Sequence, residues 1–233
     1  MRNKLRTLGL IISSICLLGV VPALAQTDEF RPSIGINAKA SNNGFGGDVY
    51  YRPYKNWAIK AGYETLNLPV KREIDQDNIT LNSEFKFETG ATSLSAIYQP
   101  FAGLYLIAGA AMLNLKPSIY GVSSGDYAIG DITIPAERVG DIRITITPER
   151  KIAPYAGFGI GNAFPRDWPV SFSLEFGAFY MGAPKLDIQA TGMLAPNADP
   201  EHIATLENEI KDFTFYPVIK FNLGIRLFTF GKK

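Results

Sequence analysis

Most of this chain alternates between apolar and polar residues with a period of two, which constrains the fold more than any other feature. The alternation is clearest near the end, where the apolar positions are Phe213, Phe215, Pro217, Ile219, Phe221, Leu223, Ile225 and Leu227. Polar residues such as Lys220 and Arg226 lie between them. Successive side chains of a β-strand point to opposite faces, so the pattern predicts long strands with one apolar and one polar face.

The alternation predicts eight strands joined by connections of unequal length. We expect the strands at 32–40, 45–53, 57–66, 79–98, 104–115, 142–161, 170–188 and 213–230. The phase of the fourth strand blurs after Gly90, which suggests a β-bulge there. In an antiparallel meander every second connection lies at the same end. One end therefore collects the short turns, at 53–56, 99–103 and 162–169, and the other collects the long loops, at 67–78, 116–141 and 189–212.

One helix is expected in the last long loop, at about 199–212. Asp199 can cap its N-terminus, Pro200 suits the first helical position, and Glu201 suits the positive end of the helix dipole. Its apolar residues then share one face: Ile203, Leu206 and Ile210. The polar face is acidic and would be repelled by anionic lipid, so we expect the helix to pack on the rim of the fold.

The first 25 residues have the features of a secretory signal peptide. Three basic residues precede an uncharged apolar stretch at 8–21, and an A-x-A cleavage signal ends at Ala25. We therefore predict a signal peptide at 1–25 and a single mature domain at 26–233. The only cysteine lies in the removed segment, so the sequence predicts neither a disulfide framework nor a cysteine zinc site. Export without disulfides suits a bacterial envelope.

Composition excludes several classes of protein. Lys and Arg total 23 against 22 Asp and Glu, which leaves no basic excess for binding nucleic acid. Aromatic residues make up 12% of the chain, too many for a disordered protein. After the signal peptide, no segment reaches the roughly 18 consecutive apolar residues that a transmembrane helix needs. A helical membrane protein is therefore excluded.

A soluble barrel has its apolar face inside and a membrane barrel has it outside, and both show this alternation. Glycines concentrate on the polar face, where a narrow lumen needs room for large side chains from the opposite wall. Aromatic residues that suit a lipid–water interface cluster beside the short turns: Tyr51, Tyr54, Trp57, Tyr98, Phe101, Phe164, Trp168, Phe228 and Phe230. We predict an all-β fold, an eight-stranded antiparallel up-and-down transmembrane β-barrel. Ten strands are possible if 127–134 adds a pair.

The predicted signal peptide, strand count, turn pattern and closing strand resemble the small outer-membrane β-barrel proteins of Gram-negative bacteria, the OmpA/OmpX-like barrels. The segments 154–162 and 212–218 also look like stretches of a poorly characterised group of outer-membrane barrels. The resemblance implies a bacterial outer-membrane location, surrounded by outer-membrane lipid and lipopolysaccharide. It also implies insertion by the outer-membrane assembly machinery, which recognises the closing strand. Such strands usually end on an aromatic residue, whereas this chain continues past Phe230.

Eight strands enclose room only for side chains or one small ligand. The charged residues predicted to face this lumen are Lys39, Asp48, Arg52, Lys60, Glu64, Lys86, Glu88, Glu175, Lys220 and Arg226. Buried charges are costly unless paired, so we expect a structural ion-pair network that closes the lumen. A selective pore would need an uncompensated ring of one sign. A short turn at 54–56 should place Lys60 opposite Tyr50.

No catalytic residue, cofactor site or metal site is predicted. His202 is the only histidine and lies on the expected loop helix, without a G-x-S-x-G or similar context. The segment 75–78 has a hint of calcium-loop spacing but lacks the glycine and the closing glutamate of such a loop.

Three functions remain open. The first is a non-catalytic barrel, expected to be a monomer, that acts in envelope structure or contacts an unknown partner through its long loops. The second is a carrier or narrow channel for a small apolar molecule, with a pocket at the loop end lined by loop aromatics and 104–115. The third is a lipid-modifying enzyme that uses His202. A soluble periplasmic barrel is the alternative fold.

Overall fold

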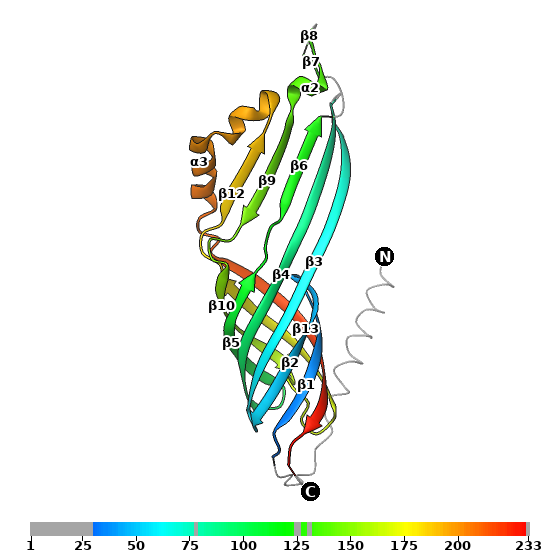
Figure 1. Ribbon diagram of the computed structural model, residues 1–233, viewed down its shortest axis with the longest axis vertical. Helices are drawn as coiled ribbons and strands as arrows, with labels where there is room; N and C mark the ends of the chain where they lie inside the picture. Colours follow the sequence, from blue (N-terminus) through cyan, green and yellow to red (C-terminus); the bar gives the residue numbers. More distant parts are fainter. Residues whose placement is uncertain (1–29, 77–78, 124–126, 130–131, 232–233) are drawn as a thin grey trace, which may run out of the picture. The chain divides into compact units, whose positions relative to one another are not determined.

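The computed structural model describes residues 30–76, 79–123, 127–129 and 132–231 (Figure 1). The predicted signal peptide lies outside the described residues. The compact unit Arg31–Lys233 contains all the elements discussed below.

Eight antiparallel strands close into a ring, which confirms the predicted fold. They are β1 (Ser33–Ser41), β2 (Gly44–Tyr54), β3 (Trp57–Gln76), β4 (Ile79–Phe101), β5 (Leu104–Leu113), β10 (Ile152–Gly161), β11 (Val170–Tyr180) and β13 (Phe215–Thr229). Each strand pairs with the next in this order, and β13 pairs with β1 to complete the barrel. Closure leaves no free strand edge within the ring.

A wall of strands continues beyond the loop end of the ring (Figure 1). The outer halves of β3 and β4 are joined there by β6 (Ser118–Ser123), β9 (Asp141–Thr147) and β12 (Lys185–Ala190). The strands β1, β2 and β13 end at the mouth of the barrel. Five strands therefore carry the wall upward on one side, and the described residues form no such wall above β13, β1 and β2.

Two predicted strands and two predicted loops differ from the structure in this region. The strand expected at 142–161 is two strands, β9 and β10, because Pro148 interrupts the ladder. The strand expected at 170–188 divides into β11 and β12 around Gly182, whose positive φ of 73° breaks the strand. The loop expected at 67–78 is largely strand, and the loop expected at 116–141 contains β6.

The segment at 127–134 does form two strands, β7 (Tyr127–Ile129) and β8 (Ile132–Ile134). They pair only with each other and do not enter the ring. A short helix, α2 (Ala136–Val139), follows them and leads into β9.

The β-bulge expected near Gly90 is absent. Pairing between β3 and β4 runs without a register shift from Trp57–Tyr98 to Gln76–Ile79. The other neighbour of β4 changes instead, from β5 below this point to β6 above it. The polarity of the two faces also inverts here, which explains the blurred phase.

The apolar face of the ring points outward, as expected for a membrane barrel. Large apolar side chains are exposed on every strand of the ring, including Ile36, Val49, Ile59, Leu94, Leu106, Phe158, Phe172 and Phe221. The aromatics beside the short turns are mostly exposed as well. Phe164 is an exception, because it is fully buried and lies inside the barrel end.

Among the described helices, none is long and apolar enough to cross a membrane.

The wall has the opposite polarity. On the face that continues the lumen side, one row of cross-strand partners is entirely apolar: Val70, Phe85, Ile119, Ile144 and Ile188. The adjacent row, on the other face, is polar: Lys71, Glu84, Tyr120, Arg143 and Gln189. The outer face of the wall is therefore polar, whereas the face toward the lumen side is apolar and partly exposed, with Val70 at 40% and Ile119 at 42%.

Inward glycines make room for tyrosine rings inside the ring. A Cβ atom on Gly159 would overlap the ring of Tyr105, and one on Gly35 would overlap that of Tyr50. Both tyrosines are the cross-strand partners of their glycines. The room is thus used by the neighbouring strand and not, as expected, by the opposite wall.

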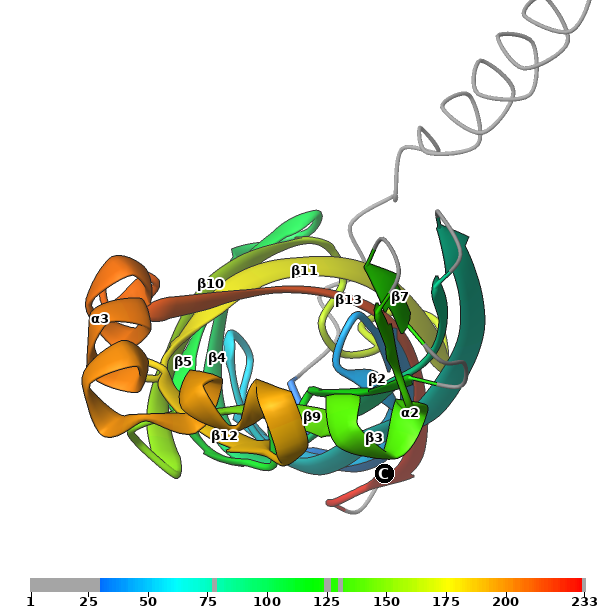
Figure 2. The ribbon, with the colours of Figure 1, turned by 90° about the horizontal axis from the view of Figure 1, so that it is seen from above.

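The predicted loop helix is present as α3 (Pro200–Ile210), after a short 3-10 helix, η2 (Gly192–Ala198). The side chain of Asp199 accepts a hydrogen bond from the Glu201 amide at 3.0 Å, which confirms the N-cap. Glu207 Oε1 accepts a hydrogen bond from the backbone amide of Leu186 at 2.9 Å. The helix therefore covers the outer edge of β12, at the side of the wall (Figure 2).

Candidate functional site: a charged lumen below an apolar cavity

Three lysines and three carboxylates form a closed circuit inside the barrel. Lys39 Nζ lies 2.7 Å from Asp48 and 3.9 Å from Glu64. Lys60 Nζ lies 3.8 Å from Asp48 and 3.0 Å from Glu175. Lys220 Nζ completes the circuit, 3.4 Å from Glu64 and 3.8 Å from Glu175. Each charge has two opposite neighbours, so the circuit is neutral.

The circuit is built from β1, β2, β3, β11 and β13, whose register sets its geometry. Lys60 is the cross-strand partner of Tyr50, which confirms that predicted register. Glu175 pairs with Lys220 across β11 and β13. All six side chains are at most 5% exposed, so the low dielectric makes each pair strong and each unpaired charge costly.

Neutral side chains complete the coordination of the carboxylates. Tyr155 donates a hydrogen bond to Glu175 at 2.7 Å, and Tyr105 donates one at 3.2 Å. Ser41 and Asn43 donate to Glu64 at 3.0 and 3.2 Å. These donors add hydrogen bonds to Glu175 and Glu64, whereas Oδ2 of Asp48 has no hydrogen-bond partner among the described residues. The two tyrosines were not predicted, although their inward phase opposite inward glycines was a usable signal.

Four predicted lumen residues do not belong to the circuit. Arg52 and Arg226 do face inward, but at the turn end, where they donate to backbone carbonyls at 165 and 166. Lys86 and Glu88 are not in the lumen. They pair at 2.5 Å on the polar outer face of the wall, because the strand is above the ring there and its faces have exchanged polarity.

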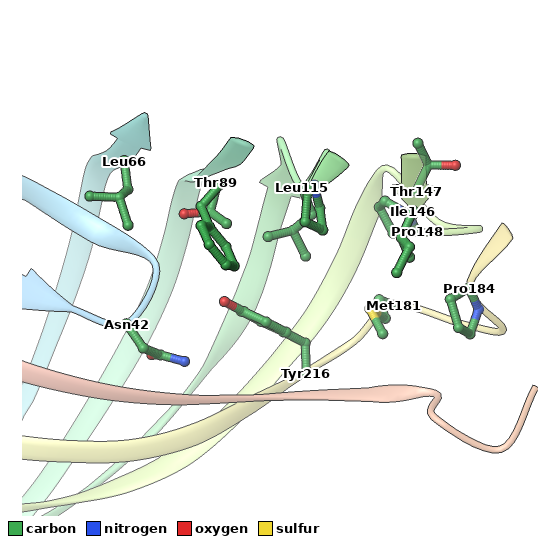
Figure 3. Close-up of a pocket in the computed structure, with 12 residues that line it drawn as sticks. Asn42, Leu66, Thr89, Leu115, Ile146, Thr147, Pro148, Met181, Pro184 and Tyr216 are labelled. Atoms are coloured by element: carbon green, nitrogen blue, oxygen red, sulfur yellow. The ribbon is translucent and has the colours of Figure 1, made fainter. Parts of the chain in front are cut away.

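An apolar cavity of about 380 Å³ lies above the charged circuit, at the mouth of the barrel (Figure 3). Leu66, Leu115 and Ile146 lie along one side in Figure 3, and Phe87 also lines the cavity. Met181, Pro184 and Tyr216 lie across from them in Figure 3. Apart from a few hydroxyls and the amide of Asn42, the lining is hydrocarbon, so the cavity suits an apolar ligand.

A possible pocket was predicted at this end of the barrel, but with other lining residues. Leu115 was included in the expected segment. The aromatic lining comes from strands, through Phe87 and Tyr216, and not from the long loops. Ile146 lies near the end of β9 and Pro184 lies just before β12, beside the two strand breaks that the alternation did not predict.

Within the described ranges, no three His, Cys, Asp or Glu side chains form a group that could hold a metal ion. His202 is exposed on α3, outside the ring.

The closed ring, the outward apolar face and the filled lumen define an eight-stranded barrel of the outer-membrane type. No protein-family model and no curated protein matches the chain. Two solved structures share the fold. Acinetobacter baumannii CarO has a TM-score of 0.57 and 19% identity, covering 84% of this chain and 98% of that one. Acinetobacter baumannii CarO2 has a TM-score of 0.57 and 18% identity, covering 85% of this chain and 100% of that one.

A major outer membrane protein from Thermus thermophilus is more distant, with a TM-score of 0.42 and 12% identity. It covers 83% of this chain and 99% of that one. At these identities the first two structures establish the fold and nothing about the ligand.

Proposed function

We propose that this protein is a non-catalytic, integral outer-membrane β-barrel that keeps its lumen closed and holds a small apolar molecule in the cavity at its loop end. The cavity is the observation that carries the proposal. It favours the carrier hypothesis over a purely structural role, because a concave, mostly apolar site with a few polar groups is typical of small-molecule binding.

The outward apolar face supports the membrane location. Exposed side chains such as Leu106 and Phe172, at 56% and 59% exposure, would be costly in water and favourable in lipid. In this orientation the short turns face the periplasm and the wall stands outside the cell. The signal peptide at 1–25 and lipopolysaccharide contacts belong to the same proposal. Mass spectrometry of the mature N-terminus and sedimentation with outer membranes test them.

The size of the cavity restricts the ligand. A dry cavity of about 150 Å³ accommodates benzene, so one of about 380 Å³ accommodates roughly 15 non-hydrogen atoms by the same scaling. The charged circuit below the cavity blocks passage of an apolar molecule through the lumen. The ligand is therefore captured and released at the loop end.

Replacement of Ile146 by Trp tests this site, because the larger side chain fills the cavity. The matched control is Ile119→Trp, on the same apolar face of the wall but outside the cavity lining. The probe is N-phenylnaphthylamine, whose fluorescence is measured on amphipol-stabilised protein after subtraction of protein-free amphipol. We expect saturable binding to the unmodified protein and to the control, and about tenfold weaker binding to Ile146→Trp. Equal binding by both variants, or no saturable binding by the unmodified protein, contradicts the proposal.

The closed lumen has its own test. The neutral circuit should prevent measurable conductance in planar bilayers, because an ion would have to displace buried, paired charges. Steady single-channel steps from the purified protein would contradict a closed lumen.

The absence of catalysis is also part of the proposal, supported by the exposed position of His202 on α3. Replacing His202 with Ala should leave the lipid A and phospholipid profiles of the cell unchanged. A changed profile would revive the lipid-modifying hypothesis. The long loops and the polar face of the wall remain the proposed surface for contacts with the environment.

A further inference from the structure

Three arginines converge at the turn end of the barrel, around the turn between β10 and β11. Arg52 Nη1 donates to the carbonyl of Pro165 at 3.3 Å, and Arg226 Nη1 donates to the next carbonyl, that of Arg166, at 3.0 Å. The side chain of Arg166 donates to the carbonyl of Gln99 at 2.7 Å. The guanidinium groups of Arg52 and Arg226 thus bind consecutive peptide groups of the turn that contains Arg166.

A buried phenylalanine brings two of these groups together. The guanidinium of Arg52 lies 4.5 Å from the centre of the Phe164 ring, and that of Arg166 lies 5.8 Å from it. Phe164 is fully buried. The three positive charges therefore share one small, partly desolvated region, where like charges repel strongly.

Two of the three arginines, Arg166 and Arg226, donate to backbone carbonyls. Neither of these two forms an ion pair with a carboxylate in the described part of the chain. Burial lowers the pKa of Arg166, and the nearby carboxylate of Asp167 opposes this shift. The lysine–carboxylate circuit farther up the lumen is neutral, so this end differs from it sharply.

Two buried hydroxyl groups beside the arginines also lack an acceptor. Tyr50 and Ser33 are each 1% exposed, and neither side-chain oxygen has a hydrogen-bond partner among the described residues. The strand register places both hydroxyl groups at the same height in the barrel as the arginines. Gly35 is the cross-strand partner of Tyr50 on one side and of Arg226 on the other, and Ser33 is the partner of Arg52. A buried donor without an acceptor is costly, and here two such donors adjoin excess positive charge.

We propose that this turn-end cluster is a binding site for a small oxyanion, a phosphate or sulfate group held by Arg166, Arg226, Tyr50 and Ser33. An oxyanion supplies the negative charge that the guanidinium groups lack and the acceptors that the two hydroxyls lack. The site is separate from the apolar cavity at the loop end, so it stands or falls independently of the proposed carrier function.

Isothermal titration with inorganic phosphate tests the site, on the full mature chain in dodecyl maltoside, which carries no phosphate. Ionic strength is held constant with sodium chloride. We expect saturable binding that Arg226→Gln weakens by about tenfold or more. Tyr50→Phe removes only the hydroxyl and keeps the ring over Gly35, so it should weaken binding by a smaller factor. Arg143→Gln removes the same charge from the outer face of the wall and should change nothing.

Circular dichroism confirms that each variant is folded, and Tyr50→Phe keeps the test decisive if Arg226→Gln does not fold. In a further experiment, phosphatidylglycerol is added before the phosphate titration. If the lipid competes with phosphate, the site binds a lipid headgroup; if it does not, the site binds free phosphate. Both outcomes support an oxyanion site. No saturable phosphate binding, or binding that Tyr50→Phe and Arg226→Gln leave unchanged, would overturn the proposal.

Discussion

The ring and the wall are built partly from the same two strands, yet they have opposite polarity. Along β3 and β4 the alternation of side chains continues without a register shift. In the ring the inner face carries Lys60 and Glu64 and the outer face carries Ile59 and Leu94. In the wall the face that continues the lumen side is apolar and the other is polar. The two regions therefore differ in their outer faces: that of the ring is apolar and suits lipid, and that of the wall is polar and suits water.

The comparison also separates two kinds of ion pair. In the ring, Glu175 is fully buried between Lys60 and Lys220. In the wall, Lys86 pairs with Glu88, and their own side chains are 43% and 33% exposed. The first pairing closes a lumen, whereas the second is a solvent-screened surface contact.

The largest expected effect follows from removing one carboxylate of the circuit. Glu175→Leu leaves two buried lysines short of a partner and should lower the free energy of unfolding by about 3–5 kcal/mol. Glu88→Leu, in the wall, should change it by less than about 1 kcal/mol. Urea unfolding of vesicle-inserted protein, followed by tryptophan fluorescence, measures both. Equal losses would remove the distinction between the two pairings.

A smaller effect is expected from a charge on the outer faces. Phe221→Arg places a guanidinium on the outward face near the middle of β13 and should cost about 2–4 kcal/mol, the range for the lipid-facing middle of a barrel. Thr145→Arg, on the polar face of the wall beside Asp187, should cost almost nothing. The same unfolding measurement applies, and a tolerated Phe221→Arg would argue against lipid around the ring.

The smallest effect concerns the edge of the wall. Asp199→Ala removes the N-cap of α3 and should weaken that helix by about 1 kcal/mol. Because α3 covers β12, amide hydrogen exchange should speed up in β12 while the strands of the ring keep their protection. Faster exchange in both regions would show that the wall and the ring do not unfold separately.

The sequence predicted the ring well because its strands obey one simple rule. A period of two shows where a strand runs, and connection lengths show how the strands are arranged. The rule failed at Lys86 and Glu88, since alternation tells which residues share a face but not what surrounds that face. It also merged β9 with β10 and β11 with β12, because the phase continues through each bend.

The charged lumen was partly predictable. The inward phase of Lys39, Asp48 and Lys60 followed from the alternation, and the cost of buried charge implied pairing. The partners were not predictable, because they depend on how far each strand is staggered against the next. The same stagger decides which tyrosines donate hydrogen bonds to Glu175. The cluster of three arginines near Phe164 depends on that stagger and on a turn that folds inward.

The sequence by itself determined the strands, the antiparallel ring and the apolar outer face, because these follow from local periodicity and the cost of burying polar groups. The wall, the cavity and the turn-end cluster depend instead on how the strands assemble in three dimensions. The wall and the cavity arise at the mouth, where β3 and β4 continue upward beside β6, β9 and β12 while β1, β2 and β13 stop. The turn-end cluster arises at the other end, where the turn between β10 and β11 meets the inward arginines of β2 and β13. Both ends bring together residues that are far apart in the chain, and no local pattern in the sequence encodes that meeting.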